Sequence, residues 1–296
     1  MKKPGRLLTA MVTPFDEEWA VDYEQVKKLA LALLNSGSDG LVVVGTTGES
    51  PTLVRSEELR LFTEVKAAAG ERGTVVAGTG SNSTAEALDA TKEAEKIGVD
   101  ACLLVVPYYN KPTQEGLYQH FKTIAESTRL PCILYNVPSR TVTSLSADTV
   151  IKLSQIDNII GIKEASGNLG EISKIISSTR DDFLVWSGND SDTFPTLALG
   201  GYGAISVASH LVGKQIKKMI DASIGGRIDE AAAIHHQLMP LVNALFVVSN
   251  PIPVKFALNH IGFRAGKPRL PLTEPDERSA TLIKEALNNY KIDLPV

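Results

Sequence analysis

The stretch VTPFDEEWAVDY, residues 12–23, connects the first apolar run of the sequence to its first helical pattern, and it contains no glycine. A doubly wound sheet usually carries a glycine-rich fingerprint at this first connection between strand and helix. The lack of glycine here therefore favours the other common architecture in which buried strands and helices alternate, a (β/α)8 barrel.

Eight apolar, β-branched runs recur at regular intervals along the chain. Such continuous runs, without strict alternation of polar and apolar residues, are typical of strands that are buried on both faces. The runs cover residues 7–15, 40–47, 74–80, 101–109, 131–138, 159–166, 183–190 and 203–210. Helical patterns lie between them. Strand followed by helix, eight times over, predicts an α/β fold with a TIM barrel across residues 1–226.

Two of the helical patterns also carry recognisable ends. The pattern at 22–37 ends in a glycine stop. The pattern at 83–98 opens with Ser83 and has Glu86 three residues later, which predicts a capping box. Beyond the eighth unit, residues 227–296 read as further helices, and we expect them to form a C-terminal helical appendage that packs on the barrel.

Composition limits the partners and the compartment. The 296 residues include 30 basic and 34 acidic side chains, so no basic excess suggests nucleic acid as a partner. No apolar run is long enough to span a membrane, and the N-terminus lacks a signal-peptide core. Cys102 and Cys132 sit in apolar runs, which favours buried free thiols over a disulfide. These features predict a cytoplasmic protein that does not bind membranes.

The active site of such a barrel lies at the carboxyl ends of its strands. These ends are rich in hydroxyl groups and small residues, and they lack the density of His, Asp and Glu that a metal site needs. We therefore expect no metal. The segments concerned are Thr13-Pro14, GTTGES (45–50), GTGSN (78–82), PYYN (107–110), YNVPSR (135–140), KEASGN (163–168), SGND (187–190) and SVAS (206–209).

Lys163 is the only lysine placed near the end of a predicted strand interior. Strand parity puts its side chain on the same face as those of Gly161 and Ile159. Desolvation favours the neutral amine, which can attack a carbonyl group to form an imine. The alternative is a structural lysine paired with Glu164 or with another buried acid. Glu164 has the opposite parity, so we expect it to face the helices.

Other strand ends supply polar groups that suit such chemistry. Tyr135 could exchange protons during imine formation, or it could simply plug the barrel. The GTTGE turn offers backbone N–H groups and the hydroxyls of Thr46 and Thr47, which together suit a carboxylate or phosphate. Arg140 has the forked geometry for a carboxylate, or it is an ordinary surface arginine. The pair at 108–109, two tyrosines, serves a site, an interface or packing.

The motifs GTTGES, PYYNKP, YNVPSRT and GIKEASGN, in this order, resemble the family of pyruvate-dependent class I aldolases. The resemblance covers essentially the whole chain, and it is the combination of motifs that is specific. It implies that Lys163 forms an imine with pyruvate and that Tyr135, Thr46 and Tyr109 form a proton relay. Tyr109 would reach in from a neighbouring subunit.

The same resemblance implies the substrate contacts and the assembly. Thr47 would bind the carboxylate of pyruvate, and Arg140 the carboxylate of L-aspartate 4-semialdehyde, the second substrate. Gly188 and Ile205 would offer main-chain contacts. The reaction would be a condensation in diaminopimelate and lysine biosynthesis that needs no cofactor. The protein would be a homotetramer, assembled as a dimer of dimers.

Two alternatives remain open. N-acetylneuraminate lyases and keto-deoxy-sugar aldolases resemble the same barrel and differ where the second substrate binds. The arginine in VPSR favours an aldehyde that carries a nearby carboxylate, and so favours the synthase reaction. A binding or regulatory barrel without turnover is the other alternative. The intact set of Lys163, Tyr135, Thr46 and Thr47 argues against it.

Many bacterial members that resemble this chain are inhibited by lysine at a cleft between subunits. The residues that fit the pattern of that cleft are Ser50, Asn82, Glu86 and Tyr108. Pro51, Arg55 and Glu58 depart from it, because they stand where lysine-sensitive members often carry alanine and two histidines. We therefore expect weak inhibition by lysine or none.

Overall fold

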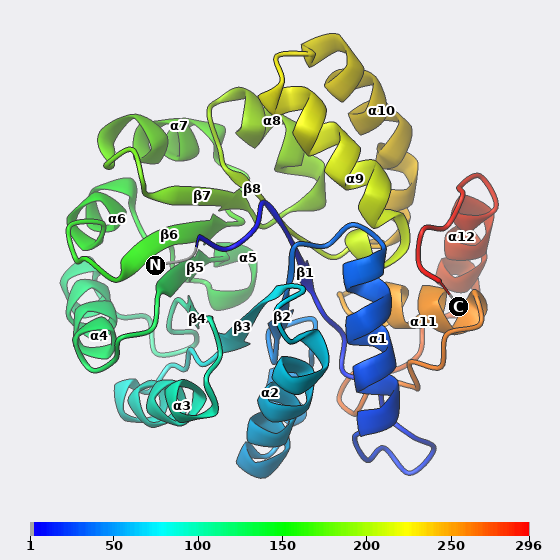
Figure 1. Cartoon of the computed structure of the whole chain (residues 1–296), viewed down its shortest axis with the longest axis horizontal. Helices are drawn as coiled ribbons and strands as arrows, with labels where there is room; N and C mark the ends of the chain where they lie inside the picture. Colours follow the sequence, from blue (N-terminus) through cyan, green and yellow to red (C-terminus); the bar gives the residue numbers. More distant parts are fainter. Residues whose placement is uncertain (1–2, 296) are drawn as a thin grey trace.

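Eight parallel strands close into a barrel in the order in which they occur in the sequence, and helices surround them (Figure 1). The computed structural model describes residues 3–295. The strands are β1 (Leu7–Ala10), β2 (Gly40–Val43), β3 (Thr74–Gly78), β4 (Ala101–Val105), β5 (Cys132–Asn136), β6 (Ile159–Glu164), β7 (Leu184–Ser187) and β8 (Gly203–Ser206). The prediction of a (β/α)8 barrel is confirmed.

Helices follow each strand, in several cases after a short extra turn. They are α1 (Tyr23–Asn35), η1 (Ser50–Thr52), α2 (Arg55–Ala69), α3 (Thr84–Ile97), α4 (Gln114–Glu126), α5 (Pro138–Thr141), α6 (Ala147–Leu153), α7 (Leu169–Ser178), η2 (Asp190–Asp192), α8 (Thr193–Ala198), α9 (Ser209–Ile224), α10 (Ile228–Ala244), α11 (Ile252–His260) and α12 (Glu277–Leu287). Here η marks a single turn of 3-10 helix.

The helix ends show why these segments begin where they do. The side chain of Asp22 accepts a hydrogen bond from Gln25 N (3.0 Å) and caps α1. Ser83 caps α3 in the same way, through Glu86 N (3.4 Å). The predicted capping box is only half formed, because the Glu86 carboxylate accepts from Ser81 Oγ (2.8 Å) instead of from the backbone of Ser83.

Apolar side chains fill two layers, one inside the barrel and one between the strands and the helices. Interior positions include Leu8, Val42 and the fully buried Trp186. Cys102 and Cys132 belong to the outer layer, on adjacent strands with their sulfur atoms 3.5 Å apart. Burial on both faces explains why the strands read as continuous apolar runs.

A β-bulge in β6 sets the direction in which Lys163 points. Strand β5 pairs first with Ile159 and then with Gly161, so that Ile160 is an extra residue. Ile159 packs in the outer layer, whereas Ile160 packs against the interior. The prediction that Lys163 shares a face with Gly161 holds, and the prediction that it also shares one with Ile159 is wrong, because the bulge shifts the alternation by one residue.

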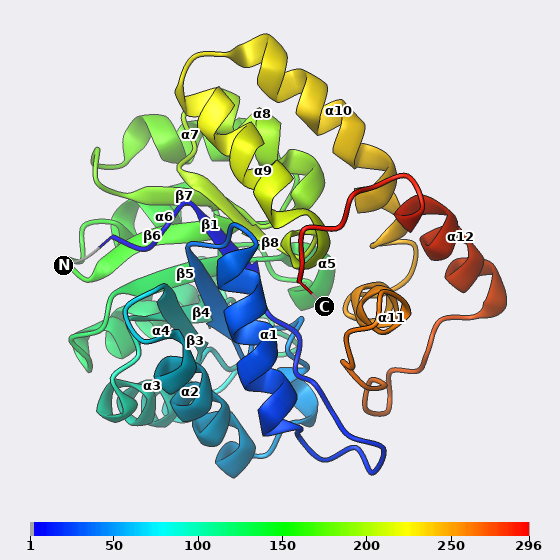
Figure 2. The ribbon, with the colours of Figure 1, turned by 45° about the vertical axis from the view of Figure 1, so that its right-hand side comes forward.

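Helices α10, α11 and α12 follow the last strand and pack on one side of the barrel, beside α9 (Figure 2). Polar contacts join this segment to the barrel at several points. Arg269 forms an ion pair with Glu57 of α2 (2.6 Å), and Asp293 N donates to Leu211 O (2.7 Å). The boundary between a barrel at 1–226 and an appendage at 227–296 stays a prediction, but the later helices are bound to the barrel.

Backbone strain is concentrated at one end of the barrel. Six non-glycine residues among those described have a positive φ angle, which L-amino acids adopt at a cost. Five of them, Trp19, Val44, Glu49, Tyr109 and Lys111, lie in connections that lead from a strand to the following helix, and Val142 lies between the short helix α5 and α6. Such strain persists only where surrounding contacts fix the backbone, and it is common at functional sites.

Candidate active site

Lys163 lies near the carboxyl end of β6 with its side chain inside the barrel, where it is 6% exposed. Its Nζ atom sits 4.2 Å from the centre of the Tyr135 ring on the adjacent strand β5, in direct register. A cation or a neutral amine over an aromatic face is held in place by the ring. The two residues that the sequence placed one strand apart are therefore brought together.

Glu164 does not pair with this lysine. Its carboxylate points out of the barrel, where it accepts hydrogen bonds from Asn136 Nδ2 (3.0 Å) and from Ser166 N (2.7 Å). Burial raises the pKa of Glu164, although these hydrogen bonds act in the opposite direction. Within residues 3–295, no ion pair involves Lys163. The structural alternative that paired Lys163 with Glu164 is excluded.

Gly188, just after β7, is packed directly against the Lys163 side chain. A Cβ atom on Gly188 would lie 3.1 Å from Lys163 Cε and 2.8 Å from Ala165 Cβ. A larger residue here would force a shift at Ala165 and would press on the lysine side chain. Ile205 of β8 is fully buried in the barrel interior. Gly188 therefore lies beside Lys163, and Ile205 lies in the barrel interior; the main-chain contacts expected of them stay a prediction.

Asp190 is a buried acid close to the lysine that the sequence reasoning did not select. Its carboxylate accepts hydrogen bonds from Ser206 Oγ and from the backbone N–H groups of Val207 and Ala208 (3.0 Å each). Burial raises the pKa of Asp190, and the positive charge of Lys163 is among the causes that lower it. The hydrogen bonds of this carboxyl group fix the end of β8.

The GTTGES turn follows β2 and carries the two threonines. Thr47 is buried, and its Oγ1 accepts a hydrogen bond from Asn250 Nδ2 (2.9 Å). Thr46 is half-buried and lines a cavity at this end of the barrel. Asn250 also accepts, through its backbone oxygen, a hydrogen bond from Arg140 Nη2 (3.1 Å). One residue from the loop before α11 therefore contacts both the predicted threonine and the predicted arginine.

Asn250 has a further property that marks it as part of a site. Its Oδ1 atom is buried and has no hydrogen-bond partner among the described residues. A buried polar atom without a partner costs free energy, so such an atom in a native structure is usually completed by water or a ligand. Sequence reasoning missed Asn250 because it lies in the C-terminal segment, far in sequence from every strand end.

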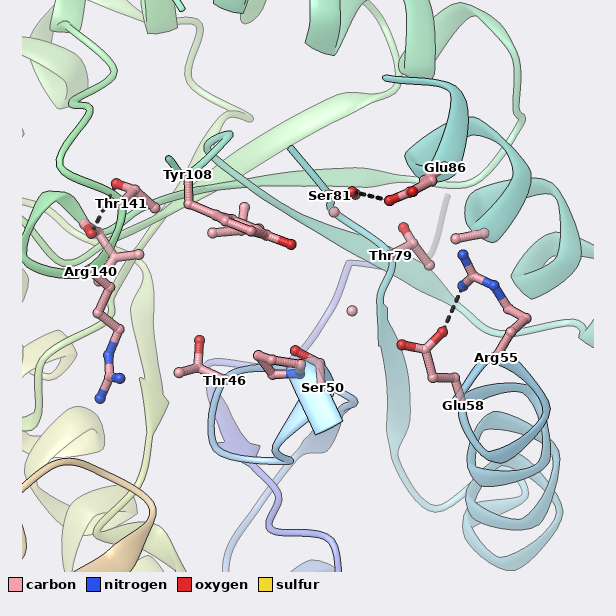
Figure 3. A pocket seen from close by; sticks show the side chains of 16 residues that line it. Thr46, Ser50, Arg55, Glu58, Thr79, Ser81, Glu86, Tyr108, Arg140 and Thr141 are labelled. Atoms are coloured by element: carbon pink, nitrogen blue, oxygen red, sulfur yellow. Dashed lines mark hydrogen bonds and ion pairs between the residues drawn. The ribbon is translucent and has the colours of Figure 1, made fainter. Parts of the chain in front are cut away.

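Tyr109 projects away from its own barrel. Its side chain is 89% exposed, and its φ angle of 75° is strained for a tyrosine. Tyr108 is 40% exposed and its ring points into a cavity (Figure 3). The structure therefore does not bring Tyr109 next to Lys163 of the same chain. An exposed tyrosine in this position fits a residue that serves another subunit.

A cavity of about 330 Å³ opens at this end of the barrel (Figure 3). Thr46 and Arg140 lie on one side of it, and Arg55, Glu58 and Glu86 lie on the other. The region predicted to bind substrate is thus continuous with the region predicted to resemble a lysine cleft.

The cleft side of this cavity is occupied by an ion pair. Arg55 Nη1 lies 2.7 Å from Glu58 Oε2, and Arg55 Nε lies 3.7 Å from Glu93 Oε2. Burial raises the pKa of Glu58, while the charge of Arg55 opposes that effect. Ser50, Pro51 and Glu86 also line the cavity, whereas the side-chain amide of Asn82 donates to the backbone oxygen of Tyr108 (3.1 Å).

Two further features of the described residues bear on other kinds of function. Of the helices in residues 3–295, none combines the length and the apolar character needed to cross a bilayer. Across the same residues, no group of three or more His, Cys, Asp or Glu side chains is arranged to hold a metal ion.

A closed (β/α)8 barrel with a lysine and a tyrosine paired at its catalytic end places the chain among the barrel enzymes. The chain belongs to the dihydrodipicolinate synthetase family, whose model matches residues 3–290. This confirms the resemblance to the pyruvate-dependent aldolases, and it shows that the chain is a lyase of that family.

Individual relatives are similar to this chain over nearly its whole length. A 4-hydroxy-tetrahydrodipicolinate synthase from Dehalococcoides mccartyi is 68% identical over 296 residues, which are 100% of both chains. The solved dihydrodipicolinate synthase from Bacillus anthracis is 45% identical, with a TM-score of 0.96 over 98% of this chain and 100% of that one. The enzyme from Cyanidioschyzon merolae, solved with lysine bound, is 48% identical, with a TM-score of 0.95 over 96% and 97%.

Proposed function

We propose that the chain has 4-hydroxy-tetrahydrodipicolinate synthase activity, which joins pyruvate to L-aspartate 4-semialdehyde in the biosynthesis of diaminopimelate and lysine. The observation that carries the proposal is the Lys163 side chain, buried inside the barrel with its Nζ 4.2 Å from the centre of the Tyr135 ring. Relatives of that name match the chain over its full length.

The first half of the reaction activates pyruvate. The neutral amine of Lys163 attacks the ketone carbon, and water leaves to give an iminium ion. The carboxylate of pyruvate is received by Thr47 and the backbone N–H groups of the GTTGES turn. Tyr135, with Thr46 and the Tyr109 of another subunit, moves the protons. Loss of a methyl proton from the iminium then gives an enamine, a carbon nucleophile.

The second half joins the two substrates. The enamine carbon attacks the aldehyde carbon of L-aspartate 4-semialdehyde, whose carboxylate is held by Arg140. The amino group of that substrate then attacks the iminium carbon. The ring closes, and Lys163 leaves as a free amine. Gly188 and Ile205 provide main-chain contacts to the bound groups. Lysine and hydroxyl groups perform every step, so no cofactor or metal takes part.

Substrate choice tests this proposal against the sister aldolases. We expect the protein to consume L-aspartate 4-semialdehyde together with pyruvate, and not to cleave N-acetylneuraminate. Arg140→Ala removes a charge-assisted hydrogen bond that only the second substrate makes, which is worth about 1.5–3 kcal/mol or roughly 10- to 150-fold. The measurement is KM for each substrate, with the other held at saturation.

The two substrates control for each other in this experiment. KM for L-aspartate 4-semialdehyde should rise by that factor, while KM for pyruvate should change by less than about twofold. An equal rise for both substrates would mean that Arg140 supports the structure through Asn250 O, and the proposed recognition of the second carboxylate would be wrong.

We also propose that the protein works as a homo-oligomer, a tetramer built as a dimer of dimers, in the cytoplasm. The side chain of Tyr109 supports an assembly of at least two chains, because it is 89% exposed and a proton-relay residue needs a neighbouring site to enter. The buried thiols of Cys102 and Cys132, only 3.5 Å apart, suit a reducing compartment. The cleft near Tyr108 would then lie close to the interface.

Free lysine should inhibit this enzyme weakly, or not at all, at millimolar concentration. Arg55 places a cation where a ligand of net positive charge would bind, and Glu58 is already engaged at 2.7 Å. Like charges at a few ångströms cost on the order of 1 kcal/mol or more at a partly buried site. The measurement is a titration of the initial rate with L-lysine at subsaturating pyruvate.

The related enzyme from Cyanidioschyzon merolae does bind lysine, so the outcome depends on the cleft of this chain. Half-inhibition well below a millimolar would show that Glu58 and Glu86 accept the ligand in spite of Arg55. The double variant Arg55→His with Glu58→His serves as the matched comparison. It should be more sensitive than the natural chain, because it removes the fixed cation and frees the cleft.

A further inference from the structure

A buried ion pair connects the C-terminal helices to the turn that carries Thr46 and Thr47. Lys255 lies on α11, and its Nζ atom is 2.8 Å from Glu49 Oε1. Both side chains are 1% exposed, and the two residues are 206 positions apart in the sequence. Of the 15 ion pairs found in the described part of the chain, this is the only one in which both side chains are so deeply buried.

Both side chains of this pair have further partners. Lys255 Nζ also donates to the backbone oxygens of Thr13 and Lys267, at 3.1 Å each. The second oxygen of Glu49 accepts from Arg269 N (2.9 Å). Burial lowers the pKa of Lys255 to about 8, and the charge of Glu49 opposes that effect. The pair thus joins the end of β1, the GTTGES turn and the segment after α11.

The turn held by this pair is strained at both ends. Val44, directly before it, has a φ angle of 59°, and Glu49 has one of 58°. A β-branched residue such as valine rarely adopts this region. Contacts must therefore hold the turn in shape. Thr13 Oγ1 donates to Gly48 O (2.6 Å). Within residues 3–295, the Glu49 side chain accepts hydrogen bonds from Lys255 Nζ and from Arg269 N and from no other group.

A gain in folding stability does not by itself explain why this ion pair is buried here. Two charges lose their hydration when they are buried, and replacing a buried ion pair by apolar residues is often neutral or stabilising. A fixed geometry is a better reason, because the ion pair has one satisfied arrangement and that arrangement sets where the turn lies. The same helix start also supplies Asn250, which donates to Thr47 Oγ1 (2.9 Å).

We propose that Glu49 and Lys255 are positioning residues for the reaction: their ion pair holds the GTTGES turn so that Thr46, Thr47 and the backbone N–H groups meet the carboxylate of pyruvate. Neither side chain reaches the substrate. This inference rests on the proposed function, since it assumes that the turn receives pyruvate. It assigns a catalytic purpose to the C-terminal helices, which complete a site built by the second strand.

The test separates position from stability with three variants. Glu49→Leu with Lys255→Met replaces the pair by apolar residues of similar volume. Glu49→Gln keeps the shape and the hydrogen bond from Arg269 N while removing the charge. Lys217→Met is the control, because Lys217 pairs with Asp39 (2.6 Å) near the opposite end of the barrel. For each variant, the melting temperature, kcat, KM for pyruvate and the rate of borohydride trapping with pyruvate alone are measured.

The double variant should keep a melting temperature near that of the natural chain, while kcat/KM for pyruvate falls by about 100-fold, as expected when a binding group moves by about 1 Å. Trapping should slow by a similar factor. Glu49→Gln should raise KM for pyruvate by at least about tenfold. Lys217→Met should leave KM for pyruvate unchanged.

The results that would overturn the inference are distinct from those that would overturn the function. If the natural chain forms no trapped adduct with pyruvate, the proposed function fails first. If the natural chain is trapped and the double variant is folded with an unchanged KM for pyruvate, the pair is only structural. If the double variant does not fold, Glu49→Gln provides the test. An unchanged KM for pyruvate in that variant would then contradict the proposal.

Discussion

We expect Lys163→Arg to lower kcat/KM by at least about 10³-fold, because the substitution removes the nucleophile and with it the covalent intermediate. Arginine stays protonated and cannot attack the ketone of pyruvate, although it keeps much of the length of the side chain. The change therefore isolates the chemistry of the amine. The measurement is the steady-state rate with both substrates, together with the mass of the protein after treatment with pyruvate and borohydride.

The natural chain should gain one reduced pyruvoyl group, and peptide mapping should find it on Lys163. Lys174→Arg, on the exposed part of α7, makes the same substitution at a lysine that pairs with Asp148, and it should retain full activity and labelling. Labelling at another lysine, or a Lys163→Arg variant that keeps most of its rate, would contradict the imine mechanism.

Tyr109→Phe should reduce kcat by about 10²- to 10⁴-fold, the usual contribution of a proton-transfer group. The ring stays and only the hydroxyl is lost, so a large effect would mean that a group with no contact to its own Lys163 takes part in the reaction. Tyr108→Phe is the matched control, since it changes the neighbouring ring in the same loop. We expect it to alter kcat by less than about threefold.

Mixing two inactive proteins locates the site that Tyr109 serves. Lys163→Ala chains and Tyr109→Phe chains are combined under conditions in which labelled subunits demonstrably exchange. In a mixed dimer, one site carries both lesions and the other carries neither, so activity should return toward about a quarter of the natural value if pairing is random. A mixture that exchanges subunits and stays inactive would place Tyr109 outside the neighbouring site.

The architecture could be predicted from the sequence because its signal is local and repeats. Each unit contains a buried strand and an amphipathic helix, and the glycine-free connection after the first strand points to a closed barrel. The first and last residues of each strand were harder to predict from the sequence. The apolar run at 7–15 contains a strand only at Leu7–Ala10, because the remaining residues form a buried connection that looks equally apolar. Burial and strand structure produce the same pattern over such short distances.

The site residues also fall into those with a local sequence signal and those without one. Lys163, Tyr135 and the threonines of the GTTGES turn lie at strand ends, where a barrel places its chemistry, so they could be predicted. Asn250 and Lys255 could not, because they approach the turn from more than 200 residues away. The prediction of which side chains share a face with Lys163 was correct for Gly161 and wrong for Ile159. Alternation fails at Ile160, and no feature of the sequence marks that bulge.

The ion pair between Glu49 and Lys255 also has a consequence for how the protein is made. Synthesis proceeds from the N-terminus at about 5–20 residues per second, so the 206 positions between the two residues correspond to roughly 10–40 s on the ribosome. During that interval the second strand and its turn already exist, but the cation that neutralises Glu49 does not. A nascent or truncated chain that lacks α11 would contain all eight strands together with Lys163 and Tyr135, and would still have an unfinished carboxylate site. Completion of the enzyme is therefore delayed until one of the last helices has emerged.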